Sequence, residues 1–335
     1  METLNLHSSG LKALPDLSTT IVKRLDASWN SIQLLWEGEL PMDLEELNLE
    51  GNMITTDGLL AIWPNTLKSI NLSKNYFWSL DQVIDWPTSL RVLNLSGSEL
   101  SVLDCSNFPE SLEELNISFT LVTTLPNFPR RLKKFVAEAT KLRLLPSRCP
   151  DSLETLTFSG TRTVVTGNSL PVYWGRSLKH LDLNSNGLRQ FPRLLPATLE
   201  YLNLSSNLIQ AIPPVEKFPK GLKSLHLGNN RIMTVPPWFS ELPKMKFTIQ
   251  NNHLTEIPNF SHCIISQPQF IGEKYFVAAL KFQRAWRRGR IPPPVRTWRR
   301  MAILKEELLA LAMCPARAGR FEDISPEWGY VYTGP

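Results

Sequence analysis

The sequence predicts an α/β repeat solenoid: an arc with a parallel β-sheet on its concave face, short extended or 3₁₀ segments on its convex side, and a small helical tail at the C-terminus. Three observations predict this fold. The phrase leucine-x-x-leucine-x-leucine-x-x-asparagine, with substitutions, recurs twelve times between Met1 and His253. Its last position returns at intervals of 20 to 25 residues, and repeats of that length must stack on their neighbours to bury a core. After Glu273 the apolar pattern changes to helical spacing.

Each phrase contains one predicted strand, because apolar and polar residues alternate in its centre. In the third repeat Leu47 and Leu49 are expected to point into the core. Glu46, Asn48 and Glu50 are expected to point to the concave face. Truncation of one inward leucine is expected to cost about 2–5 kcal/mol, so the leucine columns should dominate stability.

An asparagine closes most of the phrases, and its amide can satisfy buried backbone groups at the bend of its own and the adjacent coil. The ladder consists of Asn30, Asn52, Asn75, Asn186, Asn207, Asn230 and Asn252. Repeats five to eight carry Ser98, Thr120, Thr140 and Thr161 instead. A hydroxyl forms fewer hydrogen bonds than an asparagine amide, which predicts that the middle of the solenoid is looser or differently curved. The longest interval precedes Asn186 and predicts a surface loop near residues 165–173.

The second half of each repeat is short and rich in proline, which leaves little room for a helix. Four repeats end in a proline six residues after the asparagine, as in Asn207 to Pro213. A further set of prolines precedes strand-opening leucines by three residues: Pro41, Pro64, Pro87, Pro109, Pro129, Pro150, Pro196 and Pro219. Because proline offers no amide donor to a regular ladder, extended or 3₁₀ segments are expected on the convex side.

The combined phrase P-x-x-L-x-x-L-x-L-x-x-N-x-L-x-x-L-P resembles the leucine-rich repeat family, and within it the short repeats of bacterial effector proteins. It is also similar to repeats in proteins of large DNA viruses. The resemblance covers roughly residues 1–258 and implies the fold. The resemblance implies little about function, since proteins with this fold bind many unrelated partners.

The outward strand positions on the concave face are the predicted surface for a protein partner. They are polar, small and largely uncharged, and aromatic side chains among them are the expected anchors, because such residues concentrate binding energy. The predicted partner-binding residues are Trp29, Asn48, Glu50, Asn71, Asn94, Asn116, Phe119, His180, Asp182, Tyr201, Asn203 and His226.

Charge and cysteine content narrow the class of protein. Residues 273–335 hold 12 basic and 6 acidic residues, whereas residues 1–272 hold 24 and 25. The near-neutral solenoid is therefore a poor binder of nucleic acid. Four scattered cysteines favour a reducing compartment. The absence of a long apolar run or a signal-like start predicts no membrane span and a cytoplasmic location, in the host cytoplasm if the protein is viral.

No catalytic or metal-binding spacing stands out, so we expect a non-enzymatic protein with no cofactor and no small-molecule substrate. One enzymatic alternative exists, because bacterial effectors with similar repeats carry a ubiquitin-ligase domain with a nucleophilic cysteine. The matching residue here is Cys314, which lacks a neighbouring acid and precedes a proline. These features disfavour an activated thiolate.

The basic segment after Glu273 is expected to form helices that cover the open end of the solenoid. Within it, Phe282, Gln283, Trp286, Arg287 and Arg288 resemble an IQ motif, which implies a calmodulin-like partner. The glycine of that motif comes one position late and prolines follow, so the match is partial. Similar basic segments end many proteins of large DNA viruses.

These observations predict three parts: a solenoid over 1–258, a cap or linker over 259–272 and a basic helical tail over 273–335. The predicted function is protein–protein interaction, as an intracellular adaptor or effector. The alternatives are a ubiquitin-ligase effector that uses Cys314 and a structural component of a large DNA virus particle.

Overall fold

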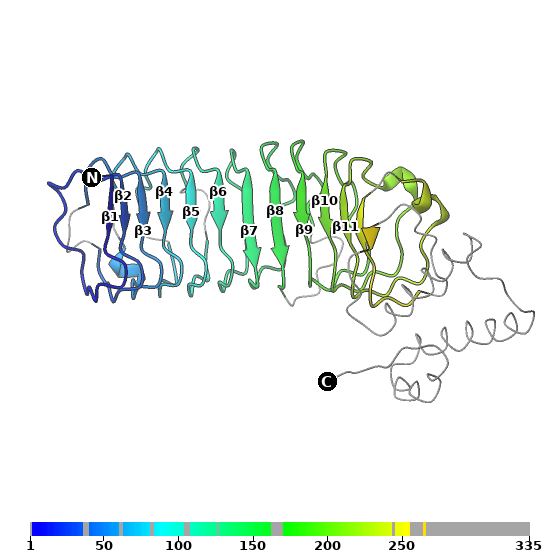
Figure 1. The fold of residues 1–335 in the computed structure, drawn as a ribbon, viewed down its shortest axis with the longest axis horizontal. Helices are drawn as coiled ribbons and strands as arrows, with labels where there is room; N and C mark the ends of the chain where they lie inside the picture. The colour runs from blue at the N-terminus through cyan, green and yellow to red at the C-terminus, as the bar shows by residue number, and fades with distance from the viewer. Residues whose placement is uncertain are drawn as a thin grey trace, which may run out of the picture.

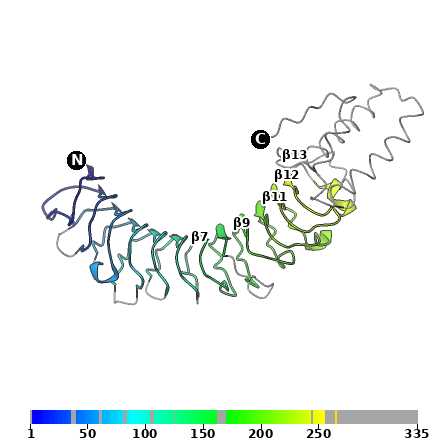
Figure 2. The same ribbon diagram turned by 90° about the horizontal axis from the view of Figure 1, so that it is seen from below.

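The structure is a computed structural model. It describes residues 2–35, 40–59, 63–80, 84–103, 108–125, 127–161, 170–242, 245–254 and 264–265. These residues form coils that lie side by side in sequence order (Figure 1). The strands line the inner side of an arc, and the rest of each coil lies on the outer side (Figure 2). The predicted α/β repeat solenoid with a concave sheet is therefore confirmed.

A single 13-stranded sheet follows the arc in the order β1 to β13. All neighbouring strands in it are parallel. Its strands are β1 (Thr3–Asn5), β2 (Arg24–Asp26), β3 (Glu46–Asn48), β4 (Ser69–Asn71), β5 (Val92–Asn94), β6 (Glu114–Asn116), β7 (Lys134–Glu138), β8 (Thr155–Ser159), β9 (His180–Asp182), β10 (Tyr201–Asn203), β11 (Ser224–His226), β12 (Lys246–Thr248) and β13 (Ile264–Ile265). The last strand continues the sheet into the segment that the sequence assigns to a cap or linker.

The core is the set of aliphatic columns that the repeat predicts. Leu47 and Leu49 are 2% and 0% exposed, and the matching residues of the other coils are buried in the same way, except Leu4 and Leu6 of the first coil, which are partly buried. In the seventh coil Phe135 and Ala137 replace leucines and are both fully buried. The outward strand residues are half-buried or exposed in most coils. Coils that share one dry interior stabilise each other through apolar burial.

The asparagine ladder ties each coil to the one before it. The Asn52 amide nitrogen donates to the carbonyl oxygens of Leu49 and of Ala27 in the preceding coil, each at 3.0 Å. The Asn52 carbonyl oxygen accepts from the amide of Ile32, again in the preceding coil, at 3.1 Å. Asn30, Asn75, Asn230 and Asn252 repeat this arrangement. Buried backbone groups are thereby satisfied across coils.

Serine or threonine takes the ladder position in the middle coils and reaches less far. The Ser98 hydroxyl donates to the carbonyl oxygen of Leu95 at 2.8 Å, and Thr120 donates to Ile117 at 2.7 Å. Both acceptors belong to the same coil as the hydroxyl. The sheet runs through the middle coils without interruption, and β7 and β8 there pair over five residues.

Proline closes a turn just before most strands. The carbonyl oxygen of each of the eight prolines accepts a hydrogen bond from the amide of the leucine three residues later, at 3.0 to 3.4 Å. On the convex side the described regular elements are the 3₁₀ turns η1 (Thr56–Gly58), η4 (Val215–Lys217) and η5 (Pro237–Glu241). This is the short convex structure that the proline content predicts.

The residue before each ladder position adopts the left-handed backbone conformation in all twelve repeats, with φ between 50° and 69°. This set comprises Ser8, Trp29, Gly51, Lys74, Gly97, Phe119, Ala139, Gly160, Ser185, Ser206, Asn229 and Asn251. Left-handed backbone is costly for residues with a side chain. Eleven of these residues are small, polar or flexible, or pack against a neighbouring residue. Phe119 is the exception.

Several predicted features lie outside the described residues. They include Cys314, the IQ-like residues 282–288, the helical tail and most of the loop predicted near 165–173.

Candidate protein-binding surface on the concave face

The middle outward position of each strand forms a row along the concave face in which asparagine and aspartate dominate. In eight coils the side-chain oxygen of this residue accepts a hydrogen bond from the backbone amide two residues later, at 2.9 to 3.1 Å. The eight residues are Asn5, Asp26, Asn48, Asn71, Asn94, Asn116, Asp182 and Asn203. Short polar side chains favour such turns, so the row helps each strand to end.

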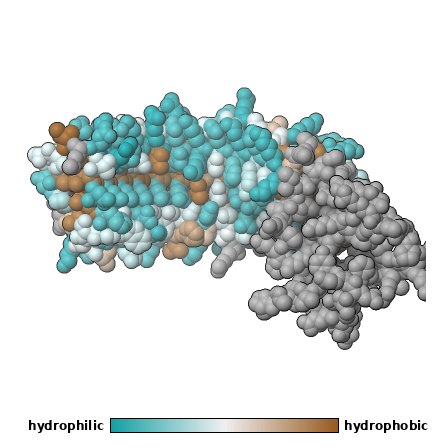
Figure 3. All heavy atoms as spheres, in the orientation of Figure 1, coloured by the Kyte–Doolittle hydropathy of each residue, from teal (hydrophilic) through white to brown (hydrophobic). Residues whose placement is uncertain are grey.

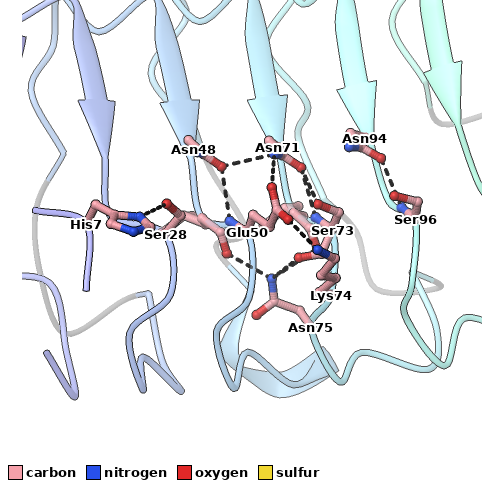
Figure 4. Close-up of polar contacts among 12 residues, drawn as sticks. His7, Ser28, Asn48, Glu50, Asn71, Ser73, Lys74, Asn75, Asn94 and Ser96 are labelled. Atoms are coloured by element: carbon pink, nitrogen blue, oxygen red, sulfur yellow. Dashed lines mark hydrogen bonds and ion pairs between the residues drawn. The ribbon is translucent and has the colours of Figure 1, made fainter. Parts of the chain in front are cut away.

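Neighbouring members of this row also bind each other (Figure 4). The Asn71 amide donates to Asn48 at 3.0 Å, and the Asn48 amide donates to Asp26 at 3.2 Å. Asn203 donates in the same way to Asp182 at 2.9 Å. Most asparagines predicted to bind a partner are therefore half-buried and already engaged within the fold. Their regular recurrence is explained by turn formation.

Glu50 and Trp29 belong to a brace across three coils. The Trp29 ring lies against Gly51, where an added Cβ would come within 2.9 Å of the ring. The Lys74 ammonium lies 4.8 Å from the centre of the Trp29 ring and 2.8 Å from the Glu50 carboxylate. These contacts fix two of the predicted anchors in place. They also account for an aromatic residue at a left-handed position.

Trp29 and Phe119 do not lie in the strand columns of the concave face. Both follow the strand and precede the ladder residue, at the left-handed turn that forms one edge of the arc. Their side chains are 51% and 63% exposed. The sequence gives their position within the repeat correctly. That position lies on the turn after the strand, however, and not beside the other predicted anchors.

The structure brings three predicted anchors together on the C-terminal half of the concave face. The rings of His180 and Tyr201 stack with centres 4.0 Å apart and planes 3° apart. The His226 ring is tilted by 45° to that of Tyr201, with the ring centres 5.3 Å apart, and we call the three rings together the aromatic stack. These residues stand on the adjacent strands β9, β10 and β11. Elsewhere on the described concave columns the side chains are mostly short, and these three rings form the largest aromatic cluster there.

Polar contacts hold the stack in position. The two ring nitrogens of His226 lie 3.0 Å from the Ser224 hydroxyl and 3.1 Å from the Thr248 hydroxyl. Burial lowers the pKa of His180, and the charge of Asp182 opposes that shift. Burial, together with the charge of Lys246, also lowers the pKa of His226. Both imidazoles are therefore neutral near pH 7 and can accept or donate a hydrogen bond.

Sequence reasoning missed the residues that surround the stack. Three further residues interact with His226: the hydroxyls of Ser224 and Thr248 and the charge of Lys246. Each occupies an outward strand position next to a predicted anchor. The signal that could have found them was available, because equal positions in successive repeats lie side by side in the sheet. The register of β9 to β12 pairs His180, Tyr201, Ser224 and Lys246 in one row.

The ends of the strands nearest the prolines carry a second row, of alternating charge. Lys133 pairs with Glu113 at 2.9 Å, Lys179 with Glu154 at 3.0 Å and Lys223 with Glu200 at 2.7 Å. Lys23 and Lys68 similarly flank Glu45. These pairs are exposed and each contributes little to stability. Together they neutralise the charge along this edge of the sheet.

The rest of the concave face offers little depth. A shallow hollow over β5 to β7 is lined by residues that include Val92, Asn94, Asn116 and Val136. Seen face on, the sheet side is mostly hydrophilic, with a narrow hydrophobic line in its N-terminal half (Figure 3). Within the described part, no group of three or more His, Cys, Asp and Glu side chains could hold a metal ion. No described helix is long and apolar enough to cross a bilayer.

Comparison with known proteins agrees with this architecture. A family model for two copies of leucine-rich repeats matches residues 197–245, and a single-repeat model matches residues 41–62. Mouse (Mus musculus) Toll-like receptor 9 is 31% identical over 134 residues, which cover 36% of this chain and 13% of that receptor. Human oligodendrocyte-myelin glycoprotein is 29% identical over 183 residues, which cover 52% of this chain and 40% of that protein. The chain thus spans less than half of these relatives.

Solved structures share the fold. The leucine-rich effector protein YopM from Yersinia pestis superposes with a TM-score of 0.50 and 25% identity, covering 80% of this chain and 83% of YopM. An internalin from Listeria monocytogenes gives a TM-score of 0.51 and 16% identity, covering 74% and 80%. The similarity to viral proteins remains a prediction. Leucine-rich-repeat solenoids use their extended concave surfaces for binding, and this chain contains leucine-rich repeats and has the arc fold of YopM-like and internalin-like proteins.

Proposed function

We propose that the protein is an intracellular adaptor or effector that binds a protein partner through the concave face, with the stack of His180, Tyr201 and His226 as the anchor. The observation that carries this proposal is the stack itself. Three half-buried rings stand together on a face whose other described residues are mostly short or engaged within the fold.

The chemistry of the stack suits a protein surface. Aromatic residues dominate interface energetics, because their large rigid area costs little conformational entropy on binding. The rings are held by their neighbours before a partner arrives, which reduces the ordering cost further. Asp182 and Lys246 lie close enough to affect the pKa of His226 and supply one charge of each sign beside the rings. The preferred partner surface is therefore amphipathic and not strongly charged.

The proposal of an intracellular location rests on chemistry alone. Cys149 is 3% exposed and unpaired, and burial raises the pKa of its thiol to about 12. Such a thiol is inert and suits a compartment in which disulfides do not form. That the protein is not an enzyme also stays a prediction, since Cys314 lies outside the described residues.

The decisive experiment compares the proteins captured by the full-length chain and by its Tyr201→Ala variant in the native cell type. Loss of the stacked ring should remove the specific partner, with an expected weakening of at least about tenfold for an interface anchor. Binding to the purified partner would then be measured by calorimetry. The proposal fails if Tyr201→Ala retains the affinity of the wild type for every partner that the wild type captures.

A matched control is available on the same row of the sheet. Ser69 occupies in β4 the position that Tyr201 occupies in β10. Ser69→Ala should leave partner binding unchanged, because Ser69 lies six coils from Tyr201. A Ser69→Ala variant that lost the partner as completely as Tyr201→Ala would contradict an anchor at the C-terminal half.

A further inference from the structure

A second exposed surface lies on the edge of the arc, outside the concave columns. It consists of Tyr76, Trp78, Glu99, Phe119 and Leu121, which we call the edge patch. Its four apolar side chains are 53%, 56%, 63% and 41% exposed in chain order. Backbone hydrogen bonds join these coils on this side, from Ser101 to Trp78 at 3.0 Å and from Leu121 to Leu100 at 2.8 Å. The patch therefore spans three consecutive coils.

The fold does not explain these side chains. In the C-terminal half the same positions beside the ladder are mostly small or polar, as with Ser206, Asn229, Gly187 and Arg231, and the one leucine there, Leu208, is half-buried. Phe119 also sits in left-handed backbone, with φ 58°, where a side chain costs about 1–2 kcal/mol. Trp29 packs on Gly51 in this conformation, whereas the Phe119 side chain is 63% exposed. A large exposed aromatic ring on left-handed backbone points to a role in binding.

Charge determines which partner fits. Glu99 lies in the coil between those of Tyr76 and Leu121, at the same position after the ladder residue. Its side chain is exposed and forms no ion pair with any described residue. The patch thus combines apolar contact area with one carboxylate that forms no ion pair with a described residue.

We propose that the edge patch docks a segment of a partner protein in which a lysine or arginine is flanked by aromatic or aliphatic residues. The basic group pairs with Glu99, and the apolar neighbours cover Phe119, Leu121 and the ring of Tyr76 or Trp78. This surface is distinct from the concave stack, so either can bind without the other. The charge-assisted hydrogen bond between the basic group and the Glu99 carboxylate becomes stronger when the partner excludes water from it.

The test uses the full-length chain and a random 16-residue peptide library displayed on phage. Peptides are selected on the wild type after subtraction on the Phe119→Ser variant. Selected peptides should contain a basic residue next to apolar ones. As soluble fluorescent peptides, they should bind Phe119→Ser and Glu99→Lys at least about tenfold more weakly than the wild type in anisotropy titrations. Unchanged far-UV circular dichroism and melting would show that both variants fold.

A charge exchange makes the test specific. A peptide whose basic residue is replaced by glutamate should bind Glu99→Lys better than it binds the wild type. Arg231→Glu, at the same position in the coil of β11, should bind the original peptide as the wild type does. Three results would overturn the proposal: selected peptides that are acidic or purely apolar, peptides insensitive to Phe119→Ser, or no selective peptide at all. Self-association of the chain that both substitutions abolish would assign the patch to a second copy and would also overturn it.

Discussion

The coils closed by asparagine and the coils closed by a hydroxyl are held to their neighbours in different ways. Asn52 and Asn207 each bond to the preceding coil through both ends of the side-chain amide. Ser98 and Thr120 each bond only to a carbonyl oxygen of their own coil. An amide carries a donor group and an acceptor on one rigid plane, whereas a hydroxyl is a single atom closer to the backbone. At the ladder position, Asn52 and Asn207 thus link neighbouring coils through their side chains, whereas Ser98 and Thr120 do not.

The backbone links the middle coils to each other as it links the coils at the ends. β7 and β8 pair over five residues, from Lys134 with Thr155 to Glu138 with Ser159, while the other described pairs match over two or three. In the asparagine-closed coils the backbone also joins neighbouring coils beyond the strand, from the amide of Leu49 to the carbonyl oxygen of Asn71 at 2.8 Å and from Gly51 to Ser73 at 2.9 Å. The expectation of a looser or differently curved middle, drawn from the hydroxyls alone, stays a prediction. In a repeat protein a weak contact in one row can be offset in the next row.

The largest effect is expected where the side-chain cross-links are most numerous. Asn207→Ala removes three donated and two accepted hydrogen bonds, which leaves the amide of Leu188 and the carbonyl oxygen of Leu183 buried without partners. We expect a loss of about 3 kcal/mol in the free energy of unfolding. Urea denaturation followed by circular dichroism measures it. A loss under about 1 kcal/mol would show that coils at the ends do not depend on the ladder.

The second prediction concerns the brace that Trp29 forms over Gly51. Gly51→Ala places a Cβ 2.9 Å from the Trp29 ring in left-handed backbone, with φ 67°. Gly97→Ala is the matched control, since its φ is 69° and its Cβ meets the flexible side chain of Lys74 at 3.2 Å. Both variants should lose about 1 kcal/mol of unfolding free energy, because a side chain is unfavourable on left-handed backbone. Gly51→Ala should lose more, because the rigid indole ring cannot move aside as a lysine side chain can. Equal losses in the two variants would contradict a rigid brace.

The fold could be predicted from the sequence because one phrase repeated twelve times fixes which residues share a column. Leu47 and Leu49 are buried for the same reason as their counterparts in every other coil, so each repeat is independent evidence for the rest. The left-handed residue before the ladder was not predicted, since its identities range from glycine to tryptophan and no single residue type marks it.

The candidate site could be predicted only in part. His180, Tyr201 and His226 follow from their columns, but their stacking depends on ring orientation, which a column does not specify. Asn48 and Asn71 were predicted to contact a partner because they face outward. Their hydrogen bonds to the next turn and to each other depend on local backbone geometry, which outward direction alone does not reveal.

A third prediction tests the hydroxyl coils directly. Ser98→Ala removes one buried hydrogen bond, to the carbonyl oxygen of Leu95, and should cost about 1 kcal/mol. Ser98→Asn restores the side chain of the other coils and should stabilise the protein relative to Ser98→Ala, if the coils there are spaced as at the ends. Thermal and urea denaturation of both variants provide the measurement. Destabilisation by Ser98→Asn below the level of Ser98→Ala would mean that the middle coils pack too closely to accept an amide.

The smallest effect is expected at the C-terminal half of the concave face and depends on pH. Burial, followed by the charge of Lys246, holds the pKa of His226 below its ordinary value of 6.5. The unfolded chain therefore takes up the proton first as the pH falls. Stability contributed by the neutral imidazole is present above about pH 6.5 and decreases below it, until the folded form is protonated as well.

His226→Gln removes this titration while an amide can still reach the hydroxyls of Ser224 and Thr248, which lie 3.0 and 3.1 Å from the ring nitrogens. Urea denaturation of the wild type at pH 7.5 and pH 5.5 should show a loss of stability on acidification that is smaller in the variant. Comparison of the two proteins at both pH values cancels what all other titrating groups contribute to the pH dependence of stability. An equal loss in both proteins would mean that the imidazole is as easily protonated in the folded chain as in the unfolded one. The stack would then be open to water, and its value as a pre-formed anchor for a partner would fall accordingly.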